Sequence, residues 1–357
     1  MKCYLLFVFC LIVSVRAEVT TLVEPSQKMP EGKTVVWSPL FQATWDAMNV
    51  KMGGKPMRVE PANELMKSLD DFKWESEKVM PKGSWKTWAG PATKKFLNQV
   101  NEEAAKMTGD ADETFQLNNL SPESIASFGL LNREVEFKES FHKSIKTPMQ
   151  FGEAKSAVRF FGTKDSSSDS YDKSVRILAF RPIDGSFALE AACKGVDDKV
   201  ILYMPPRGKE QDFQTACKWL REWKKSFAHD DEALNAWNDR FLHTGDEVRI
   251  PYVSLDTMDD FADQLNSGRF YGIAGDPWTI RRAEQKTKFE LFEKGARVRV
   301  EAVIEMDPFA ARSSHSLPPI PRKFFYDKPF FVFMWRDQAE LPYLGVWVGD
   351  DSVLKKF

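Results

Sequence analysis

Side chains that could do chemistry are few in this chain and are poorly placed for it. The four histidines lie far apart, at positions 142, 229, 243 and 315, without the spacing of metal ligands. The sequence has no Gly-x-Ser-x-Gly motif, no phosphate-binding glycine loop and no Cys-x-x-Cys pair. The acidic pairs Asp70-Asp71, Asp230-Asp231 and Asp259-Asp260 fall in polar stretches that we expect to be solvated. We therefore expect no enzyme activity, no metal site and no cofactor.

A stretch near the C-terminus instead has the composition of an exposed loop. Residues 309–323 are rich in Pro and Ser, a composition that favours presentation outside a fold. The bond Arg312-Ser313 suits a trypsin-like pocket, because a lone Arg is followed by small residues. A cut at Phe309-Ala310 would instead suit a chymotrypsin-like protease. Both bonds are candidate cleavage sites. The alternative is that Phe309, Ala310, Arg312 and Ser313 are ordinary loop residues.

The residues just before this stretch alternate with a period of two. Such alternation over twelve residues predicts a strand with one buried face. Burying its larger apolar side chains would contribute about 1.5–3 kcal/mol each. Every intervening position except Val303 is charged. The apolar set is Ala296, Val298, Val300, Ala302, Ile304 and Met306.

The N-terminus has the pattern of a signal peptide. Lys2 precedes a short apolar stretch, and small residues stand at the expected cleavage site before Glu18. We therefore divide the chain into a leader, 1–17, and a single domain, 18–357. The mature protein is expected to be secreted and extracellular, or periplasmic if the source is bacterial.

Composition narrows the class of partner. The formal net charge of the 357 residues is −2, and positive and negative residues are interspersed without a basic block. No stretch after the leader is long and uncharged enough to cross a bilayer. We expect no nucleic-acid partner, no membrane and a monomer.

The pattern of predicted elements is mixed, without regular alternation of strands and helices, which predicts an α+β fold. Residues 50–90 give no clear prediction. Strands are predicted at 34–37, 174–182, 187–192, 199–204 and 285–306, with a strand, turn and strand over 330–348. Helices are predicted from Ser38-Pro39, over 90–107 with a stripe of Phe96, Val100 and Ala104, over 212–227, and over 256–265.

Two cysteines remain once the leader is removed. If Cys193 and Cys217 form a disulfide in an oxidising compartment, the bond closes a loop worth roughly 3 kcal/mol. The alternative is a pair of buried free thiols.

Several segments, in the same order and at similar spacing, resemble the serpin family. One resembles its "Ser-Pro-Leu-Ser" helix start, one its "Ile-Asn-x-Trp-Val-Glu" helix, one its "Asn-Ala-x-Tyr-Phe-Lys" signature, one its strand ending in "Leu-Pro", and one its C-terminal "Arg-Pro-Phe-Leu-Phe". In this chain the five segments are, in the same order, Val36–Leu40, Phe96–Gly109, Asn132–Phe141, Ile201–Pro206, and Lys328–Asp337 followed by Leu344–Val346.

The resemblance implies three β-sheets surrounded by about eight helices, with an exposed reactive loop at about 293–323. In such proteins a target protease cleaves the loop, and the upstream half then inserts into the central sheet. The hinge of this movement would be Glu293, Lys294, Gly295 and Ala296. The family's spacing from the hinge favours Phe309-Ala310 as the cleaved bond.

The resemblance also implies a hydrogen-bonded, shutter-like cluster of Ser38, Asn132 and Gln285 beneath the central strands. Two departures from the family pattern bear on function. Residues 297–300 are bulky and β-prone where inhibitory members carry small residues, and the region 50–90 is short. The resemblance implies a secreted protease inhibitor, whereas these two departures favour the alternative, a non-inhibitory binding or carrier protein.

Overall fold

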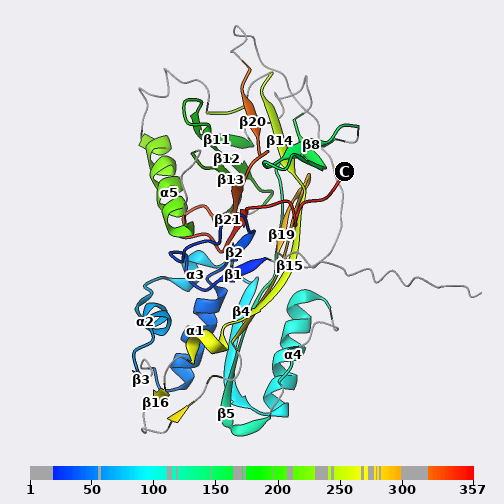
Figure 1. Cartoon of the computed structure of the whole chain (residues 1–357). Helices are drawn as coiled ribbons and strands as arrows, with labels where there is room; N and C mark the ends of the chain where they lie inside the picture. The colour runs from blue at the N-terminus through cyan, green and yellow to red at the C-terminus, as the bar shows by residue number, and fades with distance from the viewer. Residues whose placement is uncertain are drawn as a thin grey trace, which may run out of the picture.

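The computed structural model describes residues 19–54, 58–110, 115–117, 120–144, 146–163, 171, 174–195, 197–206, 212–229, 240–242, 245–266, 269–271, 277–278, 280, 283–298 and 321–357. The leader and residues 299–320 lie outside this set. The described part mixes helices and strands without regular alternation, as expected for an α+β fold (Figure 1).

A seven-stranded sheet forms the centre of one half of the molecule. The sequences of its central strands are nearly continuous apolar runs, because both faces of the sheet are covered by apolar cores. Val200 and Leu202 face one apolar core, while Ile201 and Tyr203 face a second core beneath a helix. The strand order is β1 (Thr20–Leu22), β2 (Val35–Trp37), β22 (Leu344–Val348), β21 (Phe330–Arg336), β13 (Asp198–Met204), β12 (Ser186–Ala192) and β11 (Val175–Arg181).

Two four-stranded sheets and a two-stranded sheet carry the regions that matter for function. The first has the order β20 (Lys323–Phe325), β14 (Glu247–Pro251), β10 (Phe160–Gly162) and β7 (His142–Lys143). The second has the order β15 (Val253–Asp260), β18 (Glu284–Phe292), β19 (Gly295–Val298) and β6 (Arg133–Glu136). The third pairs β4 (Trp85–Ala92) with β5 (Ser121–Leu131), and β6 follows β5 directly after Asn132.

The remaining strands are short, and the described residues contain six helices against the eight or so expected. The strands are β3 (Arg58–Glu60), β8 (Met149–Phe151), β9 (Ser156–Val158), β16 (Arg269–Tyr271) and β17 (Pro277–Trp278). The helices are α1 (Leu40–Lys51), α2 (Glu64–Asp71), α3 (Ser76–Val79), α4 (Lys94–Thr108), α5 (Phe213–His229) and α7 (Ala262–Leu265).

Helix α4 shows how the sequence fixes an element next to the site. The Thr93 hydroxyl accepts a hydrogen bond from the Phe96 amide at 3.2 Å, and Gly109 ends the helix with φ 71°. The predicted stripe of Phe96, Val100 and Ala104 packs on β4 and β5, and is thereby confirmed. The predicted start at 90 is wrong, because Gly90 belongs to β4 and lies against the Phe96 ring.

The predicted helix over 256–265 is also mostly wrong. Val253 and Leu255 are buried while Ser254 and Asp256 are exposed, so these residues follow the period of a strand. Strand β15 runs as far as Asp260, and only Ala262–Leu265 is helical.

The two cysteines are free thiols, so the possible disulfide is not formed. Cys193 lies in the core on one side of β13, and Cys217 lies in the core beneath α5 on the other side. Burial raises the pKa of the Cys193 thiol to about 12 and also raises the pKa of Cys217. Burial thus disfavours the thiolate form of both residues at neutral pH.

Candidate functional site

The predicted hinge forms a strand in the middle of a sheet. Strand β19 lies between β18 and β6 and is antiparallel to both, with Ala296 opposite Leu291 on one side and Val135 on the other. Ala296 and Val298 are 0% and 5% exposed, whereas Arg297 points outward and forms an ion pair with Glu290. The predicted alternation is confirmed for these residues.

Gly295 is required where β19 begins. A Cβ atom at this position would lie 2.0 Å from the carbonyl oxygen of Val135 on β6. No real Cβ contact is that short, so any other residue would push β19 and β6 apart. Gly295 fits this position because it has no side chain.

The turn before β19 is fixed by its backbone and by one buried carboxylate. The Phe141 amide donates to the Glu293 carbonyl at 2.8 Å, and the Phe137 amide donates to the Lys294 carbonyl at 2.7 Å. The Glu293 carboxylate lies 2.9 Å from the Lys143 ammonium. Burial alone would raise the pKa of Glu293, but Lys143 and the Tyr252 hydroxyl outweigh it and hold that pKa below its usual value.

Replacing Glu293 by Gln is expected to lower the free energy of unfolding at neutral pH by about 1–2 kcal/mol, because hydrogen bonds to a charged group are lost while Lys143 is largely exposed. A carboxylate whose folded pKa lies below its unfolded value of about 4.3 stabilises the fold above that value. The stabilisation is lost as the pH falls through the folded pKa. Urea denaturation at a series of pH values should show the difference between wild type and variant shrinking in acid; a constant difference would contradict this.

Beyond Val298 the two neighbours of β19 separate into different sheets. Strand β5, which leads into β6, pairs with β4 along one edge, and β18 pairs with β15 along one edge. In the described part of the chain β5 and β18 do not pair with each other. A strand position that β19 fills at one end is therefore continued by two unpaired strand edges.

The sheet at this position lies between two helices. Ala126 and Phe128 of β5 pack in the apolar cluster with α4. On the opposite face the Ser127 hydroxyl donates to the Thr44 carbonyl of α1 at 2.9 Å. Gly129 lies so close to α1 that a Cβ atom there would be 2.2 Å from the Thr44 hydroxyl oxygen. Alternate residues of β5 thus face α4 and α1.

The structure does not bring Ser38, Asn132 and Gln285 together as a hydrogen-bonded cluster. The Ser38 hydroxyl donates to the Tyr343 carbonyl at 2.9 Å, and Gln285 donates to the Thr287 hydroxyl at 3.3 Å. Asn132 donates to the Met107 carbonyl at the end of α4, at 2.9 Å.

The reason is the alternation of the strands. Asn132 lies on the same face as Leu130, which packs against α4. Gln285 lies on the same face of β18 as Thr287 and Phe289, which is the opposite, buried face. The Asn132 Oδ1 and Gln285 Oε1 atoms are both buried without a hydrogen-bond partner. The predicted cluster is therefore divided between the two faces of the sheet.

The sequence analysis did not predict a buried ion pair that lies next to β19. Arg133, which lies directly opposite Val298, forms an ion pair with Asp198 at the start of β13. Asp198 is 2% exposed, and burial together with this carboxylate raises the pKa of Tyr343 well above its usual value. The pair joins the sheet that holds the hinge to the seven-stranded sheet. Neither residue was recognisable, because Arg133 lies between the polar residues Asn132 and Glu134, and Asp198 follows a turn.

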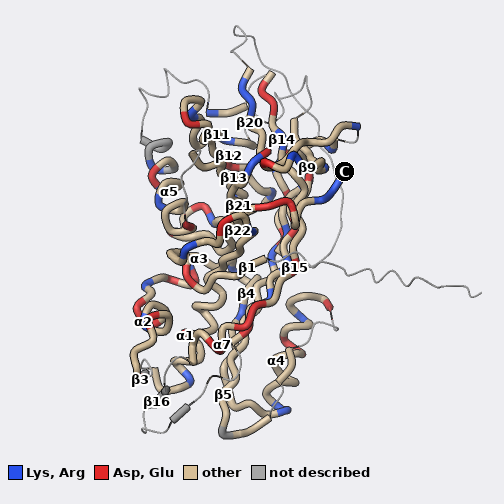
Figure 2. The backbone as a smooth tube through the Cα atoms, in the orientation of Figure 1, with Lys and Arg blue, Asp and Glu red and all other residues tan. Residues whose placement is uncertain are grey.

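The candidate cleavage residues Phe309, Ala310, Arg312 and Ser313 lie outside the described residues. Within the described ranges, no group of three or more His, Cys, Asp or Glu side chains is placed to hold a metal ion. No helix in the described part has the length and apolar character needed to cross a membrane. Figure 2 shows acidic and basic residues interspersed along the chain.

Several solved structures of other proteins share the architecture of this chain. Human thyroxine-binding globulin complexed with thyroxine matches 89% of this chain and 92% of its own, at 13% identity and a TM-score of 0.50. Human glycosylated kallistatin matches with the same coverages at 12% identity and a TM-score of 0.51, and the cleaved serpin 42Da matches 89% and 90% at 13% identity and 0.51. The chain has a serpin-like fold.

This fold explains why short resemblances in the sequence occur in the right order although nothing longer is preserved. No family model and no curated protein matches the chain by sequence. The serpin-like fold covers about nine-tenths of it, so the resemblance first noted in segments extends over almost the whole described domain.

Proposed function

We propose that this protein is a secreted protease inhibitor that is cleaved within residues 299–320 and then inserts the upstream part of that segment between β5 and β18. The observation that carries the proposal is the position of β19. Gly295–Val298 already lies between β18 and β6 with its apolar residues inward, and among the described residues no strand pairs with the edges of β5 and β18 that continue from it. A longer strand could grow there without displacing an existing one.

The register of β19 predicts where the following residues would pair. Continued along β5, it places Ala302 opposite Gly129 and Ile304 opposite Ser127, on the face towards α1. Apolar side chains would thus enter the core side. The same register places Glu301 opposite Lys286 of β18, which repeats the opposite-charge arrangement of Arg297 and Glu290.

Val303, the one apolar residue in the charged series, also finds a place in this register. It would lie opposite Phe128, in the apolar cluster between β5 and α4. The exception in the sequence pattern would thus lie beside a buried aromatic residue on the face that α4 covers.

A non-inhibitory binding or carrier protein is the second candidate. It is favoured by the extent to which the hinge is already paired in the uncleaved chain. Ala296 and Val298 are already buried, so their part of the free energy of insertion is no longer stored. The bulky residues that follow would also insert more slowly than small ones.

Incubation with trypsin separates the two candidates. An inhibitor of this type is expected to form an equimolar complex with trypsin that survives denaturing gel electrophoresis, because the acylated protease cannot complete hydrolysis. The Arg312→Ala variant, which keeps the hinge, should lose the complex with trypsin. Clean cleavage without a complex at every ratio of protease to protein would support the carrier function.

Secretion is part of the same proposal. It is supported by the signal-peptide pattern of residues 1–17, which lie outside the described part.

A further inference from the structure

The last residues of the chain run as an extended segment along a small hairpin. The C-terminus lies beside the hairpin of β8 and β9 (Figure 1). The Arg159 amide donates to the Lys355 carbonyl at 2.8 Å, and the residues after them in the two segments form an antiparallel bridge. The Phe357 amide donates to the Ala157 carbonyl at 3.1 Å. Arg159 therefore lies opposite Lys355, and Ala157 lies opposite Phe357.

The other side of this C-terminal segment continues the row that Arg159 and Lys355 begin. The Lys355 amide donates to the Tyr252 carbonyl at 3.1 Å, and the neighbouring pair, Leu354 and Val253, forms an antiparallel bridge. Arg159, Lys355 and Tyr252 therefore lie side by side across three segments. The Lys355 Nζ is 5.8 Å from the centre of the Tyr252 ring, so the ammonium lies over that ring.

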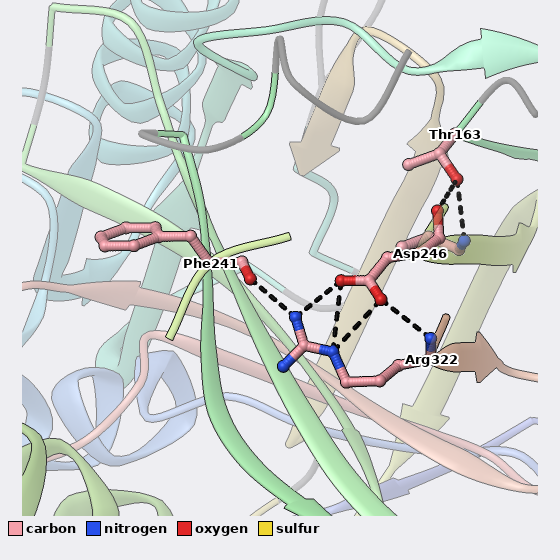
Figure 3. A network of polar contacts seen from close by, with 5 residues as sticks. Thr163, Phe241, Asp246 and Arg322 are labelled. Atoms are coloured by element: carbon pink, nitrogen blue, oxygen red, sulfur yellow. Dashed lines mark hydrogen bonds and ion pairs between the residues drawn. The ribbon is translucent and has the colours of Figure 1, made fainter. Parts of the chain in front are cut away.

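Two like charges stand directly opposite each other in this row, an arrangement that costs free energy when nothing compensates the charge. Arg159 and Lys355 are both exposed, and within the described part of the chain neither forms an ion pair with a carboxylate. Elsewhere in the fold a buried cation has a carboxylate partner, as Arg322 pairs with Asp246 at 2.6 Å (Figure 3). The row is therefore short of an anion.

The carboxylate that approaches this row is already in use. The Tyr252 hydroxyl donates to Glu293, and the Lys143 ammonium lies 2.9 Å from the same carboxylate. Glu293 is 8% exposed, whereas the side chains of Arg159 and Lys355 point to solvent. An anion that compensates the two exposed cations would have to come from outside the described chain.

An apolar side chain stands next to the two cations. Phe357 is 53% exposed, and in an extended segment it lies on the same face as Lys355, two residues before it. Ala157 and Arg159 likewise face outward, because Val158 between them is fully buried. Residues two apart are separated by about 7 Å along a strand. The outer face thus presents an apolar side chain about 7 Å from a pair of positive charges.

We propose that this face, made by Arg159, Lys355, Tyr252 and Phe357, is a docking site for an acidic segment of a partner protein. In that segment an apolar residue and an acidic residue would stand two positions apart, because an extended peptide then has the same spacing as the face. The carboxylate would lie between Arg159 and Lys355, and the apolar side chain would cover Phe357. A polysaccharide could compensate the charges but would leave Phe357 exposed.

The attraction is local. The formal net charge of the whole chain is −2, so the overall charge of the protein does not favour an acidic ligand. The docking site also does not depend on the proposed function, because none of its residues belongs to the segment 299–320. Its test is therefore separate from the test of loop insertion.

The test measures the binding of a dye-labelled peptide, Gly-Ser-Leu-Ser-Asp-Asp-Ser-Gly, to the mature chain by fluorescence anisotropy. Wild type is expected to bind in about 50 mM salt, with an affinity that falls as salt screens the charges. Arg159→Gln with Lys355→Gln should weaken binding at least about tenfold, because two contacts to the carboxylates are lost. The matched control is Lys218→Gln with Lys225→Gln, which removes two exposed charges from α5 and should bind as wild type does.

The apolar contact is tested with a double-mutant cycle. Phe357→Ser should weaken binding about threefold, and replacing the Leu of the peptide by Ser should weaken it by a similar factor. Both changes together should weaken binding no more than either alone, because they remove the same contact. Fully additive effects would show that the Leu binds elsewhere and would overturn this docking mode.

The inference is overturned if wild type does not bind the peptide, or if the α5 variant loses as much affinity as the variant at Arg159 and Lys355. A heparin oligosaccharide tests the competing occupant. If it binds wild type through the two cations, independently of Phe357, while the peptide does not bind, the face is a polysaccharide site and the proposal of a protein partner is wrong. All the substituted side chains are exposed, so thermal unfolding midpoints no lower than that of wild type are expected and serve as the folding control.

Discussion

A single cut within residues 299–320 is expected to raise the midpoint of thermal unfolding by about 10–15 °C. Inserting Val300, Ala302, Ile304 and Met306 buries apolar surface worth about 1.5–3 kcal/mol for each larger side chain, and two unpaired edges gain hydrogen bonds. A chain of this length gains about 1.5 °C for each kcal/mol, from the usual entropy of unfolding per residue. Differential scanning calorimetry of intact and cleaved protein measures the shift.

Two variants show whether the rise comes from insertion in the predicted register. Ile304→Asp should remove about half of the rise, because a carboxylate would be buried on the face towards α1. Ser314→Asp, which carries the same new charge beyond the strand, should leave the rise unchanged. An equal rise in wild type and Ile304→Asp would refute the register.

Replacing Asp198 by Asn is expected to lower the free energy of unfolding by about 3–5 kcal/mol, because the Arg133 guanidinium is left without a countercharge. Chemical denaturation monitored by tryptophan fluorescence measures the loss. The exposed pair Lys78–Glu75, in which both side chains are 68% exposed, provides the control. Glu75→Gln should change stability by less than about 0.5 kcal/mol.

The double variant Arg133→Met with Asp198→Asn separates charge from packing. It should recover much of the loss, since an apolar side chain of similar length leaves no uncompensated buried charge. A double variant as unstable as Asp198→Asn alone would show that the shape of Arg133, and not its charge, matters. Because Arg133 lies opposite Val298, the same variants also report on how firmly the hinge is held.

Local patterns in the sequence predicted the structure correctly where a periodic pattern lies within a single helix or strand. The stripe of α4 and the alternation beginning at Ala296 are periodic, and the structure confirms them where it describes them. The helix predicted over 256–265 was wrong as far as Asp260 because the acidic residues of β15 resemble a solvated helix, while its buried residues Val253 and Leu255 lie before that range.

The sequence could not predict contacts between residues that are far apart along the chain. A resemblance gives Asn132 a position in the chain but does not say which face of a strand it occupies, and a shift of one residue reverses the face. The partners of Arg133 and Arg322 are 65 and 76 residues away in sequence. Nothing in the residues next to either arginine indicates such a partner.

The four residues of β19 also set how insertion would begin. A new strand normally has to find its partners and register before any pairing rewards the loss of chain freedom. Here the first ladder pairs exist before cleavage, so the strand would grow by zippering from a preformed nucleus. Slippage is penalised at once, because moving by one residue would turn Arg297 into the core and Ala296 out of it. The speed of the process would then depend on the size of the next side chain to be seated, starting with Arg299 and Val300.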